Sequence, residues 1–473
     1  MSPAPTSYDQ IAYPSLIFWQ SHPEAMAVIA RLHGIDAPAV DTARILHVGG
    51  GDGLDAIAMA TTFPRAQVVN FDIAEAPLLR GRQWSKAAGL TNVRHELIDI
   101  LEAADRLEGP FDYILAHGIY AWVPEQVRQA VMPMIARLLS PKGIAFVSYD
   151  ALPGGYTRTA LHEMLHHRVR HLEAPSERLA AARALLREFA VPREGDQPIS
   201  VAMKKDAEAA LLQSEGSFYH DILNDYYAPQ SLTHVAGDAT RNGLHYLGEA
   251  RGRGWEKGFL DPEHARMSED ALLERLQAQD YATGRYFRSS MFIRAGIPFT
   301  RIAQQAAARD MWVWTRATAA EANLFKTDKL GLRIPDPERA AMMHRLIASG
   351  SRMMRVADLA TSPDLLGALC HYALEGMVEL RTVAPCFDTQ AGDRPVASPL
   401  ARVQAAEGEK RLVTLRHDWT MLENAGLDRL LLLLDGDHDR AALAQEWLKL
   451  SGADGMTLNQ ALQILADKAL LHA

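Results

Sequence analysis

The chain has 473 residues, 48% of them hydrophobic, and a formal net charge of −9. This composition excludes a disordered or fibrous protein, and the length predicts about three domains. The excess of acidic residues argues against a broad surface that binds nucleic acid.

From residue 44, short apolar runs alternate with stretches of helical spacing. Strands are expected at 44–48, 66–72, 92–99, 111–118 and 143–150, and helices at 53–62, 75–88 and 124–139. Strands that alternate with helices are joined by right-handed crossovers. The pattern therefore predicts an α/β fold with a parallel, Rossmann-like sheet.

The pattern changes after the fifth strand. Residues 152–230 are predicted to form a helical insertion, and further strands are expected at 244–249 and within 285–296. If these strands complete the first sheet, residues 1–151 and 231–297 form a single domain. Otherwise the two strands begin a separate domain.

The rest of the chain, 298–473, contains short helices and few strong strands. It is predicted to be a mainly helical α+β region. Gly436 is expected to form a turn between an apolar element and a capped helix.

Two cysteines, Cys370 and Cys386, allow neither a disulfide framework nor a cysteine-rich zinc site. The N-terminus lacks the pattern of a signal peptide, and no segment is apolar enough for a membrane span. We therefore expect a cytoplasmic protein with no metal and no membrane partner.

A glycine-rich turn follows the first strand and opens the next helix. Gly49, Gly51 and Gly53 lack side chains, so the backbone can turn tightly and approach a bound molecule closely. The second strand ends at Asp72, about 20 residues on, where nucleotide-binding sheets place a carboxylate for the ribose hydroxyls. Asp99 ends the third strand, where an adenine edge can lie. The pattern predicts a nucleotide site; the alternative is an incidental glycine turn in a nucleotide-free sheet.

The spacing of the glycines distinguishes between two cofactors. Dinucleotide folds typically have GxGxxG with a pyrophosphate at the helix N-terminus, whereas this turn is GGGDG. The carboxylate of Asp52 would repel a pyrophosphate but suits a cofactor that carries an ammonium and a sulfonium. We therefore expect S-adenosylmethionine rather than NAD.

Aromatic residues follow the fourth and fifth strands. His117, Tyr120 and Trp122 come after one strand, and Tyr149 and Asp150 end the other. Ligands of open α/β sheets bind at the carboxyl ends of strands, so these side chains are expected to line a substrate pocket. Their ring faces can attract a cationic amine or a sulfonium. The alternative is that the aromatic rings only pack on the top of the sheet.

Together these segments resemble a bacterial family of class I methyltransferases that carry a methyltransferase regulatory domain and include the rickettsial protein-lysine methyltransferases. The resemblance covers nearly the whole chain, and HGIYAWVP is its most specific segment. Tyr8-Asp9, Tyr13-Pro14, VSYDALPGGY, GLHYLGEA, RYFRSSM and LLLLDGDHDRAAL are also similar to family segments. The resemblance implies methyl transfer from S-adenosylmethionine to a protein or peptide amine.

The motifs and the resemblance together imply roles for single residues. Cofactor contacts are expected from His47, Gly49, Gly50, Gly51, Asp52, Gly53, Asp72, Ile73, Asp99, Ile100 and His117. Catalytic contacts are expected from His117, Tyr120, Trp122, Tyr149 and Asp150. A His or Tyr among them would take the amine proton or hold the nitrogen in line with the sulfonium methyl.

Three positions depart from the family pattern. His47 stands where the family has an acidic residue, so Asp52 or Asp55 is expected to contact the cofactor's ammonium instead. Asp150 replaces an asparagine, which exchanges an amide for a group that only accepts hydrogen bonds. Tyr156 replaces a tryptophan. These changes predict altered specificity or weak cofactor binding.

His162, Glu163 and His166 form a literal HExxH on a predicted helix. This spacing puts both imidazoles on one face, as in zinc proteases. However, no third ligand stands out, and His167 and His171 indicate a helix that is simply rich in histidine. We expect no zinc site here.

Three functions are compatible with the sequence. The first is an enzyme that methylates a protein or peptide amine of lysine type. Its C-terminal region, 298–473, would then regulate the enzyme, bind substrate or form a homodimer. The second keeps this chemistry but uses a small molecule or a modified peptide as acceptor. The third is a cofactor-binding interaction module without catalysis.

Overall fold

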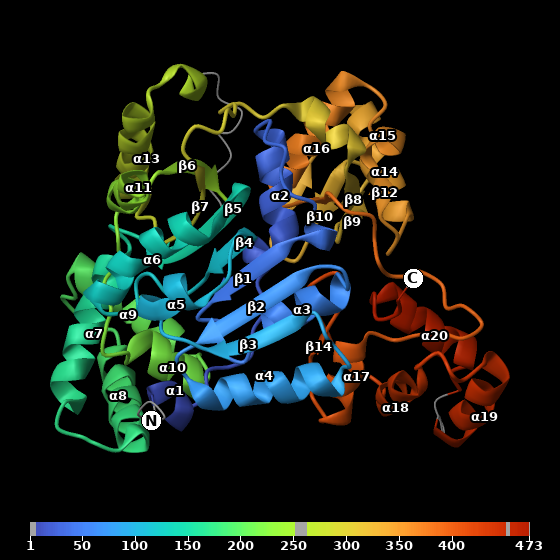
Figure 1. Cartoon of the computed structure of the whole chain (residues 1–473), viewed down its shortest axis with the longest axis horizontal. Helices are drawn as coiled ribbons and strands as arrows, with labels where there is room; N and C mark the ends of the chain where they lie inside the picture. Colours follow the sequence, from blue (N-terminus) through green and yellow to red (C-terminus); the bar gives the residue numbers. More distant parts are fainter. Residues whose placement is uncertain (1–5, 251–262, 451–454, 473) are drawn as a thin grey trace.

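The computed structural model describes residues 6–250, 263–450 and 455–472. Its centre is a seven-stranded sheet of order β3-β2-β1-β4-β5-β7-β6 (Figure 1). The strands are β1 (Arg44–Val48), β2 (Gln67–Asp72), β3 (Val93–Leu97), β4 (Phe111–Ala116), β5 (Leu139–Asp150), β6 (Leu244–Glu249) and β7 (Phe287–Arg294). β7 runs antiparallel to its neighbours β5 and β6, while the first five strands are parallel. The two late strands thus complete the first sheet and do not begin a separate one.

Helices cover both faces of the sheet because both faces are apolar. In β5, Ile144 and Phe146 pack toward α2 and α3, whereas the alternate residues Ala145 and Val147 pack toward α6 and α11. The helices on the first side are α2 (Pro23–Leu32), α3 (Leu54–Thr62) and α4 (Glu75–Ala87). Those on the second side are α5 (Ile100–Arg106), α6 (Glu125–Leu138), α11 (Leu232–Arg241) and α13 (Glu269–Thr283).

The helical insertion has its own apolar core, to which helices α7, α8, α9 and α10 contribute. These helices are α7 (Gly155–Val169), α8 (Pro175–Phe189), α9 (Pro198–Leu211) and α10 (Glu215–Ile222). The chain leaves and rejoins the sheet at adjacent points. Leu152 N–H donates to the carbonyl oxygen of Gln230, and Gln230 N–H donates to that of Asp150, both at 2.9 Å.

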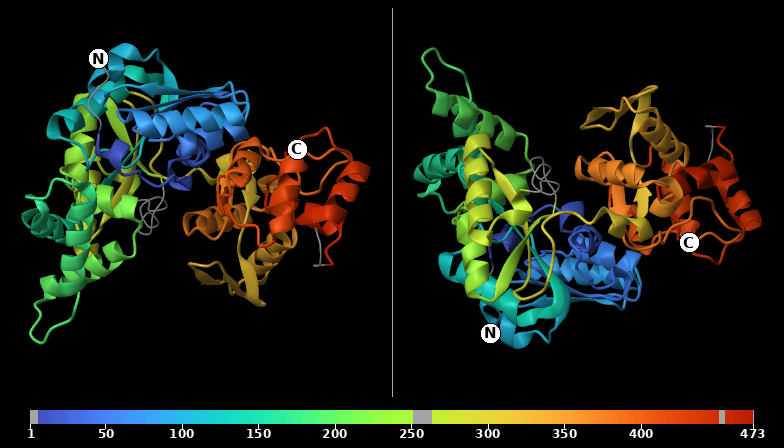
Figure 2. Two further views of the ribbon diagram at one scale, coloured as in Figure 1. Left: turned by 90° about the horizontal axis from the view of Figure 1, so that it is seen from below. Right: turned by 90° about the horizontal axis from the view of Figure 1, so that it is seen from above.

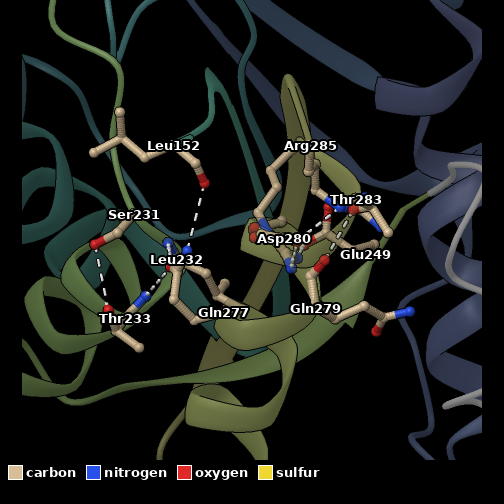
Figure 3. Close-up of polar contacts among 12 residues, drawn as sticks. Leu152, Ser231, Leu232, Thr233, Glu249, Gln277, Gln279, Asp280, Thr283 and Arg285 are labelled. Atoms are coloured by element: carbon tan, nitrogen blue, oxygen red, sulfur yellow. Dashed lines mark hydrogen bonds and ion pairs between the residues drawn. The ribbon is translucent and has the colours of Figure 1, made fainter. Parts of the chain in front are cut away.

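Side chains of α13 fix this junction (Figure 3). The carbonyl oxygen of the Gln277 side chain accepts the Leu232 N–H at 2.7 Å, and its amide nitrogen donates to the Leu152 carbonyl at 3.4 Å. Three residues along α13, Asp280 forms an ion pair of 2.8 Å with Arg285. The helix therefore ties both ends of the insertion to the end of β5.

The C-terminal region combines helices with small sheets, which confirms the predicted α+β character. It lies beside the sheet domain, on the side away from the insertion (Figure 2). Its strands are β8 (Trp312–Trp314), β9 (Thr318–Glu321), β10 (Leu324–Lys326), β11 (Gly331–Arg333), β12 (Met354–Arg355), β13 (Glu379–Arg381), β14 (Leu412–Val413) and β15 (Trp419–Thr420). Its helices are α14 (Pro337–Ala348), α15 (Val356–Leu359), α16 (Pro363–Leu374), α17 (Pro399–Ala406), α18 (Ala425–Leu433), α19 (Arg440–Leu450) and α20 (Leu458–Asp467).

Gly436 has a φ of 88° and lies between α18 and α19, as expected for a turn residue. None of the helices in the described residues combines the length and the apolar character that a membrane crossing requires. Residues 1–5 of the N-terminal segment, for which no signal peptide was expected, lie outside the described residues.

His33 directly follows α2, and its burial makes the free energy of unfolding depend on pH. Its Nδ1 lies 2.5 Å from the carbonyl oxygen of Thr300, and burial lowers the pKa of the imidazole to about 4. The unfolded chain, with a His pKa of about 6.5, takes up the proton first as the pH falls. The stability that His33 contributes is therefore complete above pH 6.5 and is lost from there down to about pH 4.

Replacing His33 by Asn keeps an amide donor but removes the titrating group. We expect the difference in unfolding free energy between wild type and His33→Asn to shrink by about 2 kcal/mol from pH 7.5 to pH 5.0. Urea unfolding at the two pH values measures this difference, and other titrating groups cancel because both proteins carry them. A difference that stays constant with pH would contradict the prediction.

Candidate functional site

A cavity of about 1040 Å³ opens at the carboxyl ends of the parallel strands. Its wall is built from the turns after those strands, the N-terminal segment and the helical insertion. The predicted site residues that line it are His47, Gly49, Gly50, Gly51, Asp52, Asp72, Ile73, Asp99, Ile100, His117, Trp122 and Asp150. Gly53, Tyr120 and Tyr149 lie outside this lining.

The glycine turn needs its glycines for two different reasons. Gly49, Gly51 and Gly53 all have positive φ angles, of 60°, 57° and 70°, a conformation that other residues rarely adopt. A Cβ on Gly51 would meet no atom within 4 Å, so this stretch of backbone faces open space in the cavity. A Cβ on Gly53 would lie 2.7 Å from side-chain atoms of Asn70 and His95. Gly51 leaves room for a ligand, whereas Gly53 permits close packing below the turn.

Asp72 joins the end of β2 to the glycine turn. One carboxylate oxygen accepts the Gly51 N–H at 2.8 Å, and the other accepts the Ala74 N–H at 2.9 Å. A carboxylate has about four lone-pair positions, so about two stay available toward the cavity. Burial raises the pKa of Asp72, although these backbone N–H groups lower it. The geometry fits a carboxylate that holds two ribose hydroxyls.

The neighbouring strand ends provide an apolar surface. Ile73 follows Asp72 and is 45% exposed on the cavity wall, so its apolar side chain can pack against a ligand. Asp99 caps α5 through a 2.9 Å bond from the Leu101 N–H, and Ile100 lines the cavity beside it. Apolar side chains of this kind can hold the flat face of an adenine ring.

The two acidic residues expected to replace the family's carboxylate lie on different sides of the turn. Asp52 faces the cavity, where Ser15 donates a hydrogen bond to it. Asp55 lies behind the turn, 2.6 Å from Nε2 of His417. Burial raises the pKa of Asp55, but the neighbouring His417 and its hydrogen bond bring the pKa below its usual value. Burial lowers the pKa of His47, which favours the neutral imidazole on the cavity wall. Asp52 is therefore the better placed partner for an ammonium.

His117 lies at the end of β4 as a neutral imidazole. Burial lowers its pKa to about 4; the charge of Asp55 opposes this shift. Its Nδ1 lies 3.0 Å from the Ser148 hydroxyl oxygen, and its ring centroid lies 4.0 Å from that of Phe18. A neutral, oriented imidazole on the cavity wall can accept a hydrogen bond from the N–H of an amine that is to be methylated.

Asp150, at the end of β5, is held by two donors. Arg158 from α7 and the hydroxyl of Tyr227 both lie 2.7 Å from its Oδ2 atom. The carboxylate that replaces the family's amide therefore belongs to an ion pair with the insertion.

Tyr120 and Tyr149 are fully buried below the cavity. The Tyr120 hydroxyl donates to Asp238 at 2.6 Å, and the Tyr149 hydroxyl lies 3.1 Å from the Ser290 hydroxyl. Both side chains pack on the sheet beneath the site. The strand-end rule predicts that they line the cavity, but the structure places them outside its lining.

The N-terminal segment and α10 add residues whose roles the sequence did not reveal. Tyr8, in α1 (Ser7–Gln10), stacks on His220 with ring centroids 3.9 Å apart. The Tyr13 hydroxyl lies 3.5 Å from the Asp221 carboxylate, and Asp9 accepts a 2.9 Å bond from the start of α4. The segment thus bridges the insertion and the cofactor side. In the sequence, the two family-like pairs Tyr8-Asp9 and Tyr13-Pro14 mark this segment but do not indicate its role.

The HExxH histidines face one carbonyl group. Nε2 of His162 and Nε2 of His166 lie 2.6 and 3.1 Å from the Asn224 carbonyl oxygen. Since a carbonyl only accepts, both nitrogens carry protons and donate. Within the described ranges, no group of three His, Cys, Asp or Glu side chains could hold a metal ion.

Three family models match the chain. A "Methyltransferase domain" matches residues 45–143, a "Predicted methyltransferase regulatory domain" matches 214–294, and "PKMT, C-terminal winged helix domain" matches 393–473. With the sheet and the glycine turn, these matches define a class I methyltransferase that depends on S-adenosylmethionine. The chain combines the methyltransferase match with a match to the methyltransferase regulatory domain.

Known proteins are similar over large parts of the chain. Uncharacterized protein RP028 of Rickettsia prowazekii is 29% identical over 220 residues, which are 46% of this chain and 88% of the relative. Uncharacterized protein RP789 of the same organism is 29% identical over 300 residues, which are 62% of this chain and 54% of that relative. The structure of PKMT2 from Rickettsia typhi in complex with AdoHcy superposes with a TM-score of 0.78 and 21% identity, covering 97% of this chain and 99% of PKMT2. At this identity the likeness is one of fold.

Proposed function

We propose that this methyltransferase acts on a lysine-type amine of a protein or peptide. The PKMT-type C-terminal domain and the fold shared with PKMT2 support this choice of acceptor. We also propose that residues 1–151 and 231–297 form the cofactor-binding domain, 152–230 an acceptor-binding insertion, and 298–473 a C-terminal region.

The observation that carries the proposal is the charge of the cavity wall. Seven aspartates and three arginines line it. Each arginine already has a carboxylate partner, in the pairs Arg80–Asp52, Arg158–Asp150 and Arg178–Asp225. The excess of carboxylates attracts a cation such as the ammonium of lysine.

Asp221 of α10 is the carboxylate we assign to the acceptor. It lines the cavity, where the Tyr13 hydroxyl lies 3.5 Å away. Burial raises the pKa of Asp221 to about 6, against the opposing effect of Arg158. A carboxylate with this pKa can hold a cationic amine and can also accept its proton near neutral pH.

Methyl transfer requires a neutral amine nitrogen in line with the methyl group. S-adenosylmethionine supplies an electrophilic methyl on sulfur: the nitrogen lone pair forms the new N–C bond, the S–C bond breaks, and its electron pair stays on sulfur. In the proposed site, Asp221 binds the incoming ammonium and takes its proton, and His117 orients the nitrogen. Asp72 and the glycine turn hold the nucleoside, so alignment and exclusion of water account for most of the catalysis.

Replacing Asp221 by Asn tests the acceptor. We expect the KM for a lysine peptide to rise about tenfold or more, because the charge that attracts the ammonium is lost, while the KM for S-adenosylmethionine stays unchanged. The measurement is transfer of labelled methyl to lysine peptides and to proteins of a cell lysate.

Glu215→Gln is the matched control, since it removes an exposed negative charge from the first turn of the same helix, outside the cavity. It should leave both KM values unchanged. Equal effects of the two substitutions would reject the role of Asp221. Label that enters only small molecules would reject the protein acceptor.

A further inference from the structure

The C-terminal region reaches the back of the glycine turn through one tight hairpin. The turn between β14 and β15 is closed by bonds from the Thr414 N–H to the Asp418 carbonyl at 2.9 Å and from the His417 N–H to the Thr414 carbonyl at 3.0 Å. His417 has a φ of 61° within it. A histidine in this conformation costs free energy, so its surroundings must hold it there.

Those surroundings are the start of α3. Nε2 of His417 lies 2.6 Å from Oδ1 of Asp55, and the two side chains are 0% and 3% exposed. The same oxygen accepts the Phe18 N–H at 3.3 Å. Asp55 is in the first turn of α3, two residues after Gly53. Removing His417 leaves the buried carboxylate of Asp55 without this partner.

This pair lies directly behind the cofactor side of the cavity. His47 lines the cavity and is buried, and its Nδ1 has no hydrogen-bond partner within the described part of the chain. A Cβ on Gly50 would lie 2.8 Å from that nitrogen. The charge of Asp55, which His417 contacts, raises the pKa of His47 against the larger, lowering effect of burial. The hairpin therefore sits one side chain away from the glycine turn.

A second set of contacts holds the other side of the turn. Glu407 accepts the Trp84 indole N–H at 2.7 Å, and Glu409 lies 3.4 Å from Arg80. Arg80 stacks over the Trp84 ring at 4.4 Å and lies 4.0 Å from Asp52. Apolar side chains of α17 and β14 also pack with those of α3 and α4. Both helices that flank the glycine turn are thus fixed from the C-terminal region.

We infer that His417 is a positioning residue for the cofactor: by holding Asp55, it keeps the start of α3 and the glycine turn in the conformation that binds S-adenosylmethionine. The C-terminal winged-helix region is then a structural part of the cofactor site. This inference concerns cofactor binding alone and stands whether or not the acceptor is a lysine.

Two amide substitutions in the full-length protein distinguish the effect of the His417–Asp55 hydrogen bond from a general effect on folding. Asn tolerates a positive φ well but is too short to reach Asp55, whereas Gln places an amide nitrogen near the position of Nε2. We expect His417→Asn to weaken S-adenosylhomocysteine binding at least tenfold, which corresponds to about 1.4 kcal/mol. His417→Gln should bind within about threefold of wild type. Calorimetry with S-adenosylhomocysteine measures both.

Thr382→Val controls for a general weakening of the domain contact. The Thr382 hydroxyl donates at 2.7 Å to Glu24 on α2, at the same boundary but outside the cavity lining. This variant should unfold at a lower temperature and still bind S-adenosylhomocysteine like wild type. If Thr382→Val weakens binding as much as His417→Asn, or if His417→Asn binds like wild type, the inference is wrong. Should His417→Asn fail to fold, Asp55→Ala replaces it, since it removes the oxygen that His417 contacts, with the same expected loss and the same contradicting result.

Discussion

Replacing Asp72 by Ala is expected to lower the affinity for S-adenosylhomocysteine at least about 100-fold. The substitution removes the acceptor for the Gly51 N–H as well as the lone pairs that face the cavity. Hydrogen bonds to a charged group contribute about 1.5–3 kcal/mol each, so the loss of two ribose contacts alone accounts for a change of this size. Calorimetric titration of the purified protein measures it.

Two further variants serve as an intermediate case and as a control. Asp72→Asn keeps one acceptor oxygen and should lose about tenfold in affinity. Asp105→Ala removes an exposed carboxylate whose ion pair with Arg137 contributes little to stability, and should bind like wild type. Binding by Asp72→Ala within about threefold of wild type would show that the nucleoside lies elsewhere.

Replacing Gly81 by Ala is expected to destabilise the protein by about 3 kcal/mol and to weaken cofactor binding with it. A Cβ at this position in α4 would lie 2.1 Å from the Asp52 carbonyl oxygen and 2.9 Å from the His95 ring. The nearest atom belongs to the backbone, so α4 must move away from the glycine turn. Urea unfolding and S-adenosylhomocysteine titration measure the two effects.

Gly237→Ala is the matched comparison within a helix. A Cβ there would meet only the far end of Arg241, at 3.6 Å. Since alanine favours the helix by about 1 kcal/mol relative to glycine, this variant should be as stable as wild type or more so. If the two alanine variants were equally stable, the close contact between α4 and the glycine turn would not hold in solution.

The sheet was predictable because its signals are local. Each of the first five strands is a short apolar run next to a helix with its own periodicity, and Asp72 follows the glycine turn by a fixed number of residues. These features depend on neighbours within about 20 residues, the range in which sequence patterns carry most information. The same holds for the alternating apolar residues of β5, which face both layers of helices.

The contacts around Tyr120, Tyr149 and Asp221 were harder to predict from the sequence because they join distant segments. Strand ends predict that Tyr120 and Tyr149 face a pocket, but Asp238 and Ser290, 118 and 141 residues away, bind their hydroxyls below the cavity. Asp221 meets the N-terminal segment across 208 residues. No local sequence pattern predicts such pairings, since they depend on how the insertion and the N-terminal segment fold back over the sheet.

The junction of the insertion has a consequence for how such enzymes diversify. Because the chain departs at Leu152 and returns at Gln230 with a 2.9 Å hydrogen bond between them, the loop of helices closes on itself at its base. A segment anchored in this way can lengthen, shorten or be exchanged without altering the order of the strands or the pocket for the nucleoside. Selection can therefore change the acceptor of the methyl group while the source of that group stays the same.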